Sequence, residues 1–361
     1  DMHSTSSLNL LKKLERLVKA AGFEKLDFER KMTAIKVHFG EPGNLAYLRP
    51  NFAARLASMV KEKGGKPYLT DCNTLYSGER TNAPDHLDAA FSNGYNPLSA
   101  GCHVIIGDGV KGTDYREIEV NLDYTQTAMI GTAIADADII ITLNHFKGHE
   151  QTGFGGALKN LGMGCASIGG KLFQHSGNPP FIYQKNCTGC NICVISCAHD
   201  AVHLGEDRKA FIDNDKCTGC GQCVAVCQFD AARVQWSSEG DVLSKKVAEY
   251  AFAVVKDKPA LHINFIIDVS PDCDCWGHND RPLVEDIGIA ASTDPLALDK
   301  ACADMVMEAP AAWHLREKDN DNDLRGEDKF RIAHGSTDWN TGLLHGEKIK
   351  LGSLSYKLIK I

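Results

Sequence analysis

The sequence predicts an α/β fold in which a mostly parallel sheet is flanked by helices and interrupted by a small cysteine-rich insert. Short β-branched segments alternate with longer helical patterns between residues 33 and 167, as in βαβ units. From residue 184 to 236, regular cysteine spacing replaces hydrophobic periodicity, and the α/β pattern then resumes. We therefore predict a body made of residues 1–183 and 237–361, and an inserted domain at 184–236.

Each element of the body follows from a local pattern. Runs rich in Val, Ile and Thr predict strands at 34–39, 67–71, 103–107, 138–145, 261–268 and 287–290. Amphipathic patterns predict helices at 46–63, 84–93, 124–136 and 242–255. We expect a further helix after Asp294, a preferred N-cap residue, because Pro295 suits the first turn.

Charge and composition exclude several classes of protein. A net charge of -8 argues against a nucleic-acid-binding surface, and the sequence has no apolar run long enough to predict a membrane span. A lysine-rich amphipathic stretch at 8–18 lacks the apolar core of a secretory signal, so we expect a cytoplasmic protein. Its partners should be proteins or small molecules, and a homodimer is expected only from the frequency of two-fold assemblies.

Eight of the 14 cysteines form two identical runs in the insert. Each run follows C-x2-C-x2-C-x3-C, the bacterial ferredoxin spacing, in which three cysteines bind one [4Fe-4S] cluster and the fourth binds the other. The first cluster is thus assigned to Cys187, Cys190, Cys193 and Cys227. The second is assigned to Cys217, Cys220, Cys223 and Cys197. The competing interpretation, a pair of zinc knuckles, usually needs only four ligands in paired C-x2-C form.

Four further segments carry a family resemblance. They are TDCNTLYSGERTNAPDHL at 70–87, NHFKGHEQTGFGGALKNLGMGCAS at 144–167, PDCDCWGHND at 271–280 and LGSLSYKLIKI at 351–361. Together they resemble the domain of unknown function 362 family, from about residue 33 onward. The resemblance implies an α/β protein with a two-cluster ferredoxin-like insert at this place, and it supplies no reaction.

Polar residues follow each predicted strand. In an open α/β sheet, ligands bind beyond the carboxyl ends of the strands, so these residues should converge on one crevice. They are His38, Gly40, Glu41, Asp71, Cys72, Asn73, Tyr76, Asp108, Gly109, Asn144, His145, Lys147, Gly148, His149 and 272–275. For any single position the alternative is an ordinary loop residue. Among them, His145, His149, Lys147 and Asp71 are the candidates for catalysis.

Cys273 and Cys275 are the sharpest subset of the crevice. Residues two apart on an extended segment point the same way and could present two thiolates to one metal ion or third iron–sulfur centre. Cys165, His278, His145 or His149 could complete that site. Two alternatives remain open from the sequence: a redox-active thiol pair, and a pair of inert cysteines.

The remaining signals bear on substrate and function. Gly153 to Gly156 precede a predicted helix with Lys159 and Asn160, which suits an anionic small molecule, and no ATP or NAD motif is present. We favour an iron–sulfur protein whose clusters relay electrons to or from a site in the α/β domain, as an oxidoreductase of unknown substrate in an anaerobe. The alternatives are a ferredoxin-like carrier that docks a redox protein partner, and a non-catalytic iron–sulfur sensor or scaffold.

Overall fold

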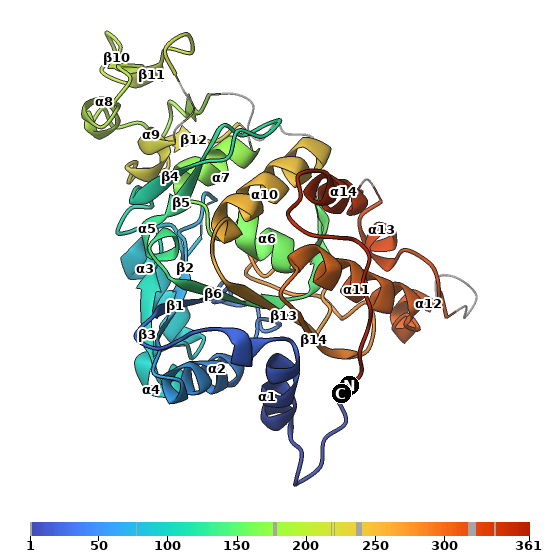
Figure 1. Ribbon diagram of the computed structural model, residues 1–361. Coiled ribbons are helices and arrows are strands. Elements are labelled where there is room, and N and C mark those ends of the chain that lie inside the picture. The colour runs from blue at the N-terminus through green and yellow to red at the C-terminus, as the bar shows by residue number, and fades with distance from the viewer. Residues whose placement is uncertain are drawn as a thin grey trace.

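A six-stranded sheet forms the centre of the body in the computed structural model (Figure 1). The structure describes residues 2–76, 78–175, 179–217, 219, 221–235, 240–316, 323–335 and 337–361. The sheet has the order β14-β13-β6-β1-β2-β3. Its strands are β1 (Met32–Val37), β2 (Lys66–Asp71), β3 (His103–Ile106), β6 (Ile139–His145), β13 (Ala260–Ile266) and β14 (Gly288–Ser292). All neighbours pair in parallel except β14, which runs antiparallel to β13 along one edge.

Helices cover both faces of this sheet, as Figure 1 shows. One face packs against α1 (Leu10–Ala20), the 3-10 helix Phe23–Lys25, α2 (Pro50–Glu62), α3 (Ala83–Ser92) and α4 (Pro97–Ala100). The other packs against α6 (Ala157–Gly162), α10 (Gly240–Val255), α11 (Pro295–Glu308) and α14 (Asn340–Lys348). In β6 the side chains alternate between the two cores: Ile139 and Ile141 face the first, and Ile140 faces the second. The predicted α/β fold with a mostly parallel sheet is confirmed.

The helix predicted at 124–136 is wrong. The chain forms an antiparallel hairpin of β4 (Tyr115–Glu119) and β5 (Thr127–Gly131), followed by one helical turn, α5 (Thr132–Ala135). Asn121 adopts a left-handed backbone conformation (φ 51°), and the Leu122 N–H donates to the Thr125 carbonyl, which closes the hairpin turn. Alternate burial along β5 fits a strand that packs one face on the core.

Short elements complete the body. After β6, the hairpin of β7 (Lys147–His149) and β8 (Gly153–Gly155) leads into α6, and α7 (Ile168–His175) precedes the insert. Two short helices, α12 (Trp313–Arg316) and α13 (Lys329–Ala333), lie before α14. Within the described residues, no helix is both long and apolar enough to cross a bilayer.

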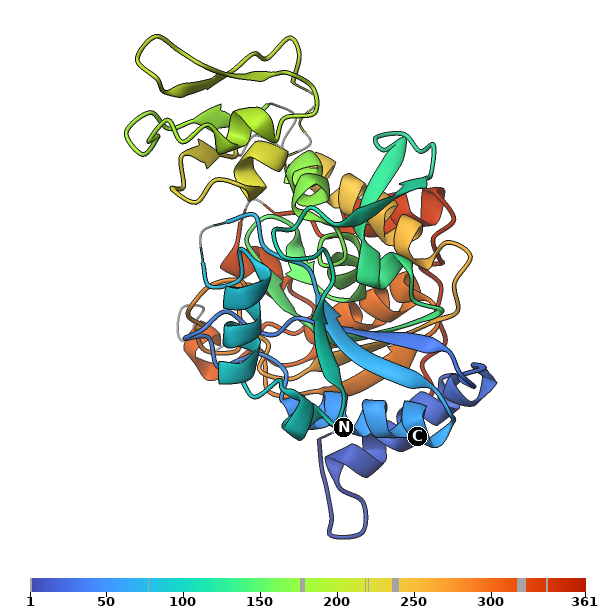
Figure 2. The same ribbon diagram turned by 90° about the vertical axis from the view of Figure 1, so that its left-hand side faces the viewer.

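The insert protrudes from one side of the body in both views (Figures 1 and 2). Its elements are β9 (Phe181–Ile182), α8 (Ile192–Ile195), β10 (Val202–Leu204), β11 (Ala210–Ile212), α9 (Gln222–Ala225) and β12 (Ala232–Arg233). The sequence repeat becomes a structural repeat, because α8 and α9 each start after a left-handed residue, Asn191 or Gly221. Antiparallel pairing of β9 with β12 brings the two ends of the insert together. The boundaries at 184 and 236 stay predictions, and residue 236 lies outside the described part of the chain.

Candidate functional site

A cavity of about 670 Å³ lies at the carboxyl ends of the central strands. Its wall takes His38 from the end of β1, Asp71 from β2, the segment from His145 to His149 after β6, and Cys273 to Cys275 from the loop after β13. These groups are far apart in the sequence, and the parallel sheet brings them to one edge. We call this cavity the crevice. Asn73 and Asp108 instead form a buried hydrogen-bonded pair with an Nδ2–Oδ1 distance of 2.9 Å, outside its lining.

His145 fixes the loop that carries the two cysteines. Its Nδ1 lies 2.8 Å from the Asp274 carboxylate, and its Nε2 lies 2.9 Å from the Ile267 carbonyl oxygen. Both ring nitrogens therefore face acceptors within the fold. The Gly148 N–H donates to the Ser270 carbonyl at 2.8 Å, which ties the same loop to β7. His145 therefore holds the site together, and neither ring nitrogen is left for a substrate.

Cys273 is buried, and positively charged groups and hydrogen-bond donors surround its sulfur. The Lys159 ammonium lies 3.6 Å from its Sγ, and His149 hydrogen-bonds to it. The Cys275 thiol donates a hydrogen bond to Cys273, and together with Lys159 and Lys147 it lowers the pKa of Cys273 well below the usual thiol value. The same bond raises the pKa of Cys275. These contacts therefore favour the thiolate at Cys273 over the thiolate at Cys275.

The tautomer of His149 follows from its contacts. Its Nδ1 accepts hydrogen bonds from the backbone N–H groups of Gln151 and Thr152, each at 3.1 Å. Burial and the Lys159 charge lower its pKa, so we assign a neutral ring with its proton on Nε2. That proton is the one offered to Cys273.

The structure does not bring Cys165 or His278 to this pair. Cys165 is buried in the core with its Sγ 3.6 Å from the Asn160 carbonyl oxygen, and the His278 ring packs beside Trp276. Neither lines the crevice. In the described part of the chain, no three His, Cys, Asp or Glu side chains are arranged around a single metal position. A third metal site at Cys273 and Cys275 stays a prediction; Lys159 and His149 both contact Cys273.

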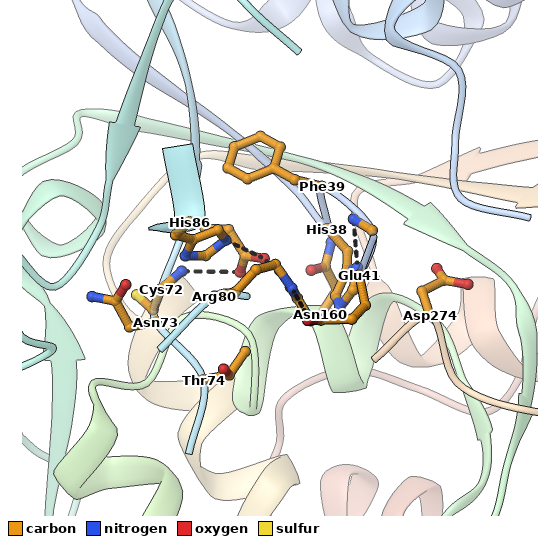
Figure 3. A network of polar contacts seen from close by, with 12 residues as sticks. His38, Phe39, Glu41, Cys72, Asn73, Thr74, Arg80, His86, Asn160 and Asp274 are labelled. Atoms are coloured by element: carbon orange, nitrogen blue, oxygen red, sulfur yellow. Dashed lines mark hydrogen bonds and ion pairs between the residues drawn. The ribbon is translucent and has the colours of Figure 1, made fainter. Parts of the chain in front are cut away.

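Asp71 lies in a buried network of charges, part of which Figure 3 shows. Its carboxylate is 2.9 Å from the Lys36 ammonium and 3.4 Å from the Arg80 guanidinium, and Arg80 also contacts Glu41 at 2.8 Å. The Lys36 charge, with those of nearby His38, His86 and Arg80, holds the pKa of Asp71 well below its usual value despite burial. Asp71 therefore positions two cations, Lys36 and Arg80, beside it at the edge of the crevice.

Sequence reasoning missed several of these groups. Lys36 interrupts an otherwise apolar buried strand, a signal that could have marked it, because a lysine is rarely buried without a partner. Arg80 gave no comparable signal. Lys171 and His175 on α7 also line the crevice, and Lys159 was noted for anion binding but not for its contact with Cys273.

The cysteines predicted to bind the first cluster lie close together in the insert. Cys187, Cys190, Cys193 and Cys227 line one small cavity in the insert. Burial, with the other three thiols close by, raises the pKa of Cys193. Each cysteine of a [4Fe-4S] cubane binds a different iron, so its sulfurs lie farther apart than ligands of a single ion. This set fits the first predicted cluster.

Backbone N–H groups point at several of these sulfurs. Ala210 N lies 3.3 Å from Cys187 Sγ, Ala231 N lies 3.3 Å from Cys227 Sγ, and Ala201 N lies 3.3 Å from Cys197 Sγ. Such donors stabilise thiolate ligands of iron–sulfur clusters. In the second repeat, Cys217 and Cys223 are described, whereas Cys220 lies outside the described residues.

The second half of the insert touches the walls of the crevice. Helix α9 packs against α7, where a Cβ at Gly221 would lie 3.1 Å from the Leu172 side chain. Segment 74–76 lines the crevice and also a second cavity of about 790 Å³, whose other wall is Val224 to Gln228. One helix and one loop therefore connect the two regions.

Comparison with known proteins identifies the family of the chain. A family model described as "Domain of unknown function (DUF362)" matches residues 33–304, which confirms the family; the ferredoxin-like insert stays a prediction. A thylakoid-associated protein of Synechocystis sp. is 29% identical over 134 residues, a match that spans 37% of this chain and only 38% of that relative.

Two solved structures are similar in part. The lactate racemase apoprotein from Thermoanaerobacterium thermosaccharolyticum has a TM-score of 0.41 at 11% identity, covering 78% of this chain and 52% of that one. A protein from Thermotoga maritima has a TM-score of 0.39 at 11% identity, with coverages of 73% and 52%.

Proposed function

Because the chain belongs to the family described as Domain of unknown function (DUF362), whose description names no reaction, we propose its function from geometry. The proposal is an iron–sulfur redox protein whose insert relays electrons to or from the crevice. In this proposal the insert holds two [4Fe-4S] clusters, which supply one-electron transfer when bound. The crevice then holds the substrate, which makes the protein an oxidoreductase of unknown substrate.

The observation that carries the proposal is the cysteine cavity of the insert. Four thiols from two distant segments line one cavity, and backbone N–H groups are aimed at the sulfurs of Cys187 and Cys227. The internal repeat gives further support, because α8 and α9 place Cys193 and Cys223 at equivalent positions. Two equivalent half-sites favour two clusters over one.

The contact between insert and body supports the relay. Helix α7 contacts α9 at one end and contributes Lys171 and His175 to the crevice. An electron carrier does not need a body of this size. The large body, and the contact of α7 with both the insert and the crevice, therefore favour a catalytic site in the crevice. Reduced thiols and oxygen-sensitive clusters would suit the cytoplasm of an anaerobe.

A carrier that docks a redox protein partner is the second candidate. The insert exposes several large apolar side chains, Ile195, Phe211 and Phe229. Exposed apolar groups close to a cluster suit a transient contact with another redox protein. In the relay this same surface would receive the external electrons, so the two candidates differ only in whether the crevice reacts.

Anaerobic iron analysis and electron paramagnetic resonance test the proposal. Two cubanes require about eight irons per chain, and reduction with dithionite should give the signal of reduced [4Fe-4S] clusters. Cys193→Ser should lose or alter one cluster. Cys102→Ser, at a buried thiol of the body, should leave both unchanged. Zinc in place of iron, or iron that does not depend on Cys193, would overturn the proposal.

A further inference from the structure

We infer that Cys273 and Cys275 form a redox-active dithiol at the end of the electron path, exchanging one electron with each of the two clusters. This inference deepens the proposed function and rests on it. It assigns the crevice a chemistry of its own: a reversible thiol–disulfide couple that turns two one-electron transfers into one two-electron reaction.

The two cysteines lie close enough together to form a disulfide bond. Both cysteines line the crevice, Cys273 buried and Cys275 half-buried, and their sulfur groups are hydrogen-bonded to each other. The Trp276 N–H donates to the Cys273 carbonyl at 3.1 Å, so the segment turns at the pair. Cys275 is the more exposed residue of the two.

The surroundings favour a thiolate at Cys273. Lys159 on α6 contacts its sulfur at 3.6 Å, Lys147 on β7 adds a second positive charge, and His149 donates a hydrogen bond. Cysteines placed next to lysine and histidine donors are the ones that react as nucleophiles and redox centres. The nearby Asp274 carboxylate is held by His145, which limits its repulsion of the thiolate.

The other thiols of the body lack this environment. Burial raises the pKa of Cys102 to about 11 and that of Cys165 to about 12, and it also raises the pKa values of Cys72 and Cys302. Lysine ammonium groups around Cys273 also oppose a metal cation, because like charges repel at short range. The arrangement therefore favours the redox pair over the metal site.

The redox step balances with the two clusters. On oxidation, the S–H bond of Cys275 breaks and its proton leaves to solvent. One S–S bond forms between Cys275 and the Cys273 thiolate, and two electrons leave, one to each oxidised cluster. On reduction, two electrons return, the S–S bond breaks, Cys273 becomes a thiolate and Cys275 takes up the proton.

Two measurements on the anaerobically prepared full chain test the inference. Equilibration with mixtures of oxidised and reduced dithiothreitol, followed by acid trapping, alkylation and peptide mass spectrometry, should show a disulfide between Cys273 and Cys275. Reductive titration of the oxidised protein should consume about two more electron equivalents per chain in wild type than in Cys275→Ser. Cys102→Ser is the matched control and should behave as wild type.

The outcomes separate the two proposals. If iron and both cluster signals are present while wild type and Cys275→Ser take up equal electron equivalents, the dithiol inference fails alone. A metal ion other than cluster iron that is lost in Cys273→Ser would also overturn it. If no iron is bound, the proposed function itself fails. The disulfide mapping uses wild-type protein, so a variant that does not fold cannot obscure the result.

Discussion

The pKa of Cys273 is lowered by the donors around its sulfur, first the Cys275 thiol and then the Lys159 ammonium, and burial opposes them. Burial alone raises the pKa of a thiol, as the core cysteines show, yet at Cys273 the donors around the sulfur reverse the direction. Lys159 lies in contact with the sulfur, whereas Lys147 also contacts Asp274, with its Nζ 4.0 Å from that carboxylate. Lys159 is therefore the positioning charge to test.

Replacing Lys159 should shift the pH dependence of Cys273 alkylation. A lowered pKa keeps the thiolate populated as the pH falls below the usual thiol range, so the wild-type rate with iodoacetamide should stay high near neutrality. Lys159→Met removes a cation and raises the pKa, and each unit of increase slows the reaction near neutral pH about tenfold. Mass spectrometry of the Cys273 peptide across a pH series measures this rate.

Lys159→Arg is the conservative companion of that variant. It keeps the charge and should retain most of the wild-type profile. A structural role for Lys159 would change the amount of folded protein and leave the position of the pH profile unchanged. Equal profiles for wild type and Lys159→Met would contradict the charge argument. The charged and titratable groups that face Cys273 are Lys159, Lys147, His149, His175 and Cys275.

Residues at strand ends were predictable, and their partners were not. The crevice position of Cys273 and His145 follows from the rule that parallel strands end at one edge. The contact between Lys159 and Cys273 joins residues 114 positions apart and depends on how α6 packs, which no local pattern contains. Arg80 is similar, because its partners Glu41 and Asp71 come from two different strand ends.

At the scale of elements, close packing of α6 on α10 sets the position of Lys159. Gly162 ends α6, and a Cβ there would lie 2.0 Å from the Val247 carbonyl oxygen of α10. Asp299 of α11 holds the other end of α6, accepting hydrogen bonds from the N–H groups of Ala157 and Leu158 at 2.8 Å each. The short helix is thus fixed at both ends by the body.

Gly162→Ala should destabilise the body and loosen the crevice. A methyl group at that distance forces α6 away from α10, and overpacking of this kind costs about 1–3 kcal/mol in the free energy of unfolding. Urea denaturation followed by circular dichroism measures the loss. Gly335→Ala is the matched control, because its added Cβ would have only one neighbour, at 3.9 Å. Equal stability of the two variants would show that α6 adapts without cost.

The strands of the sheet were easier to predict than the β4–β5 hairpin. Strands β6 and β13 are buried over almost their whole length and read as apolar runs, the pattern of a parallel sheet. The hairpin lies over the core with one face outward, and Ala128 and Met129 of β5, with the alanines of α5, also fit a helical period. A short apolar run of this kind is ambiguous, and only the turn at Asn121 distinguishes the two structures.

At the scale of the whole molecule, insert and body have separate cores. The insert core is small, formed by Val202, Ala210, Val226 and Ala232 with cysteines around them, whereas the body has a large core on each face of its sheet. We expect a domain with so little apolar area to depend on the proposed clusters for its stability. The body should not, because its sheet is complete without the insert.

Excision of the insert should therefore leave a folded body. The Tyr183 N–H donates to the Ala231 carbonyl at 2.7 Å, so a short Gly/Ser linker can replace residues 184–230 without moving either end. We expect the melting temperature of the body to fall by no more than about 4 °C, measured by circular dichroism, since the lost contact is mainly that of α9 on α7.

Bound iron should vanish, while Cys273 should keep its fast alkylation near neutral pH, because Lys159, Lys147 and His149 all belong to the body. Full-length protein stripped of iron is the control. An excised chain that aggregates or loses its cooperative transition would show that the body needs the insert to fold, and an excised chain with slow Cys273 alkylation would show that the insert shapes the crevice.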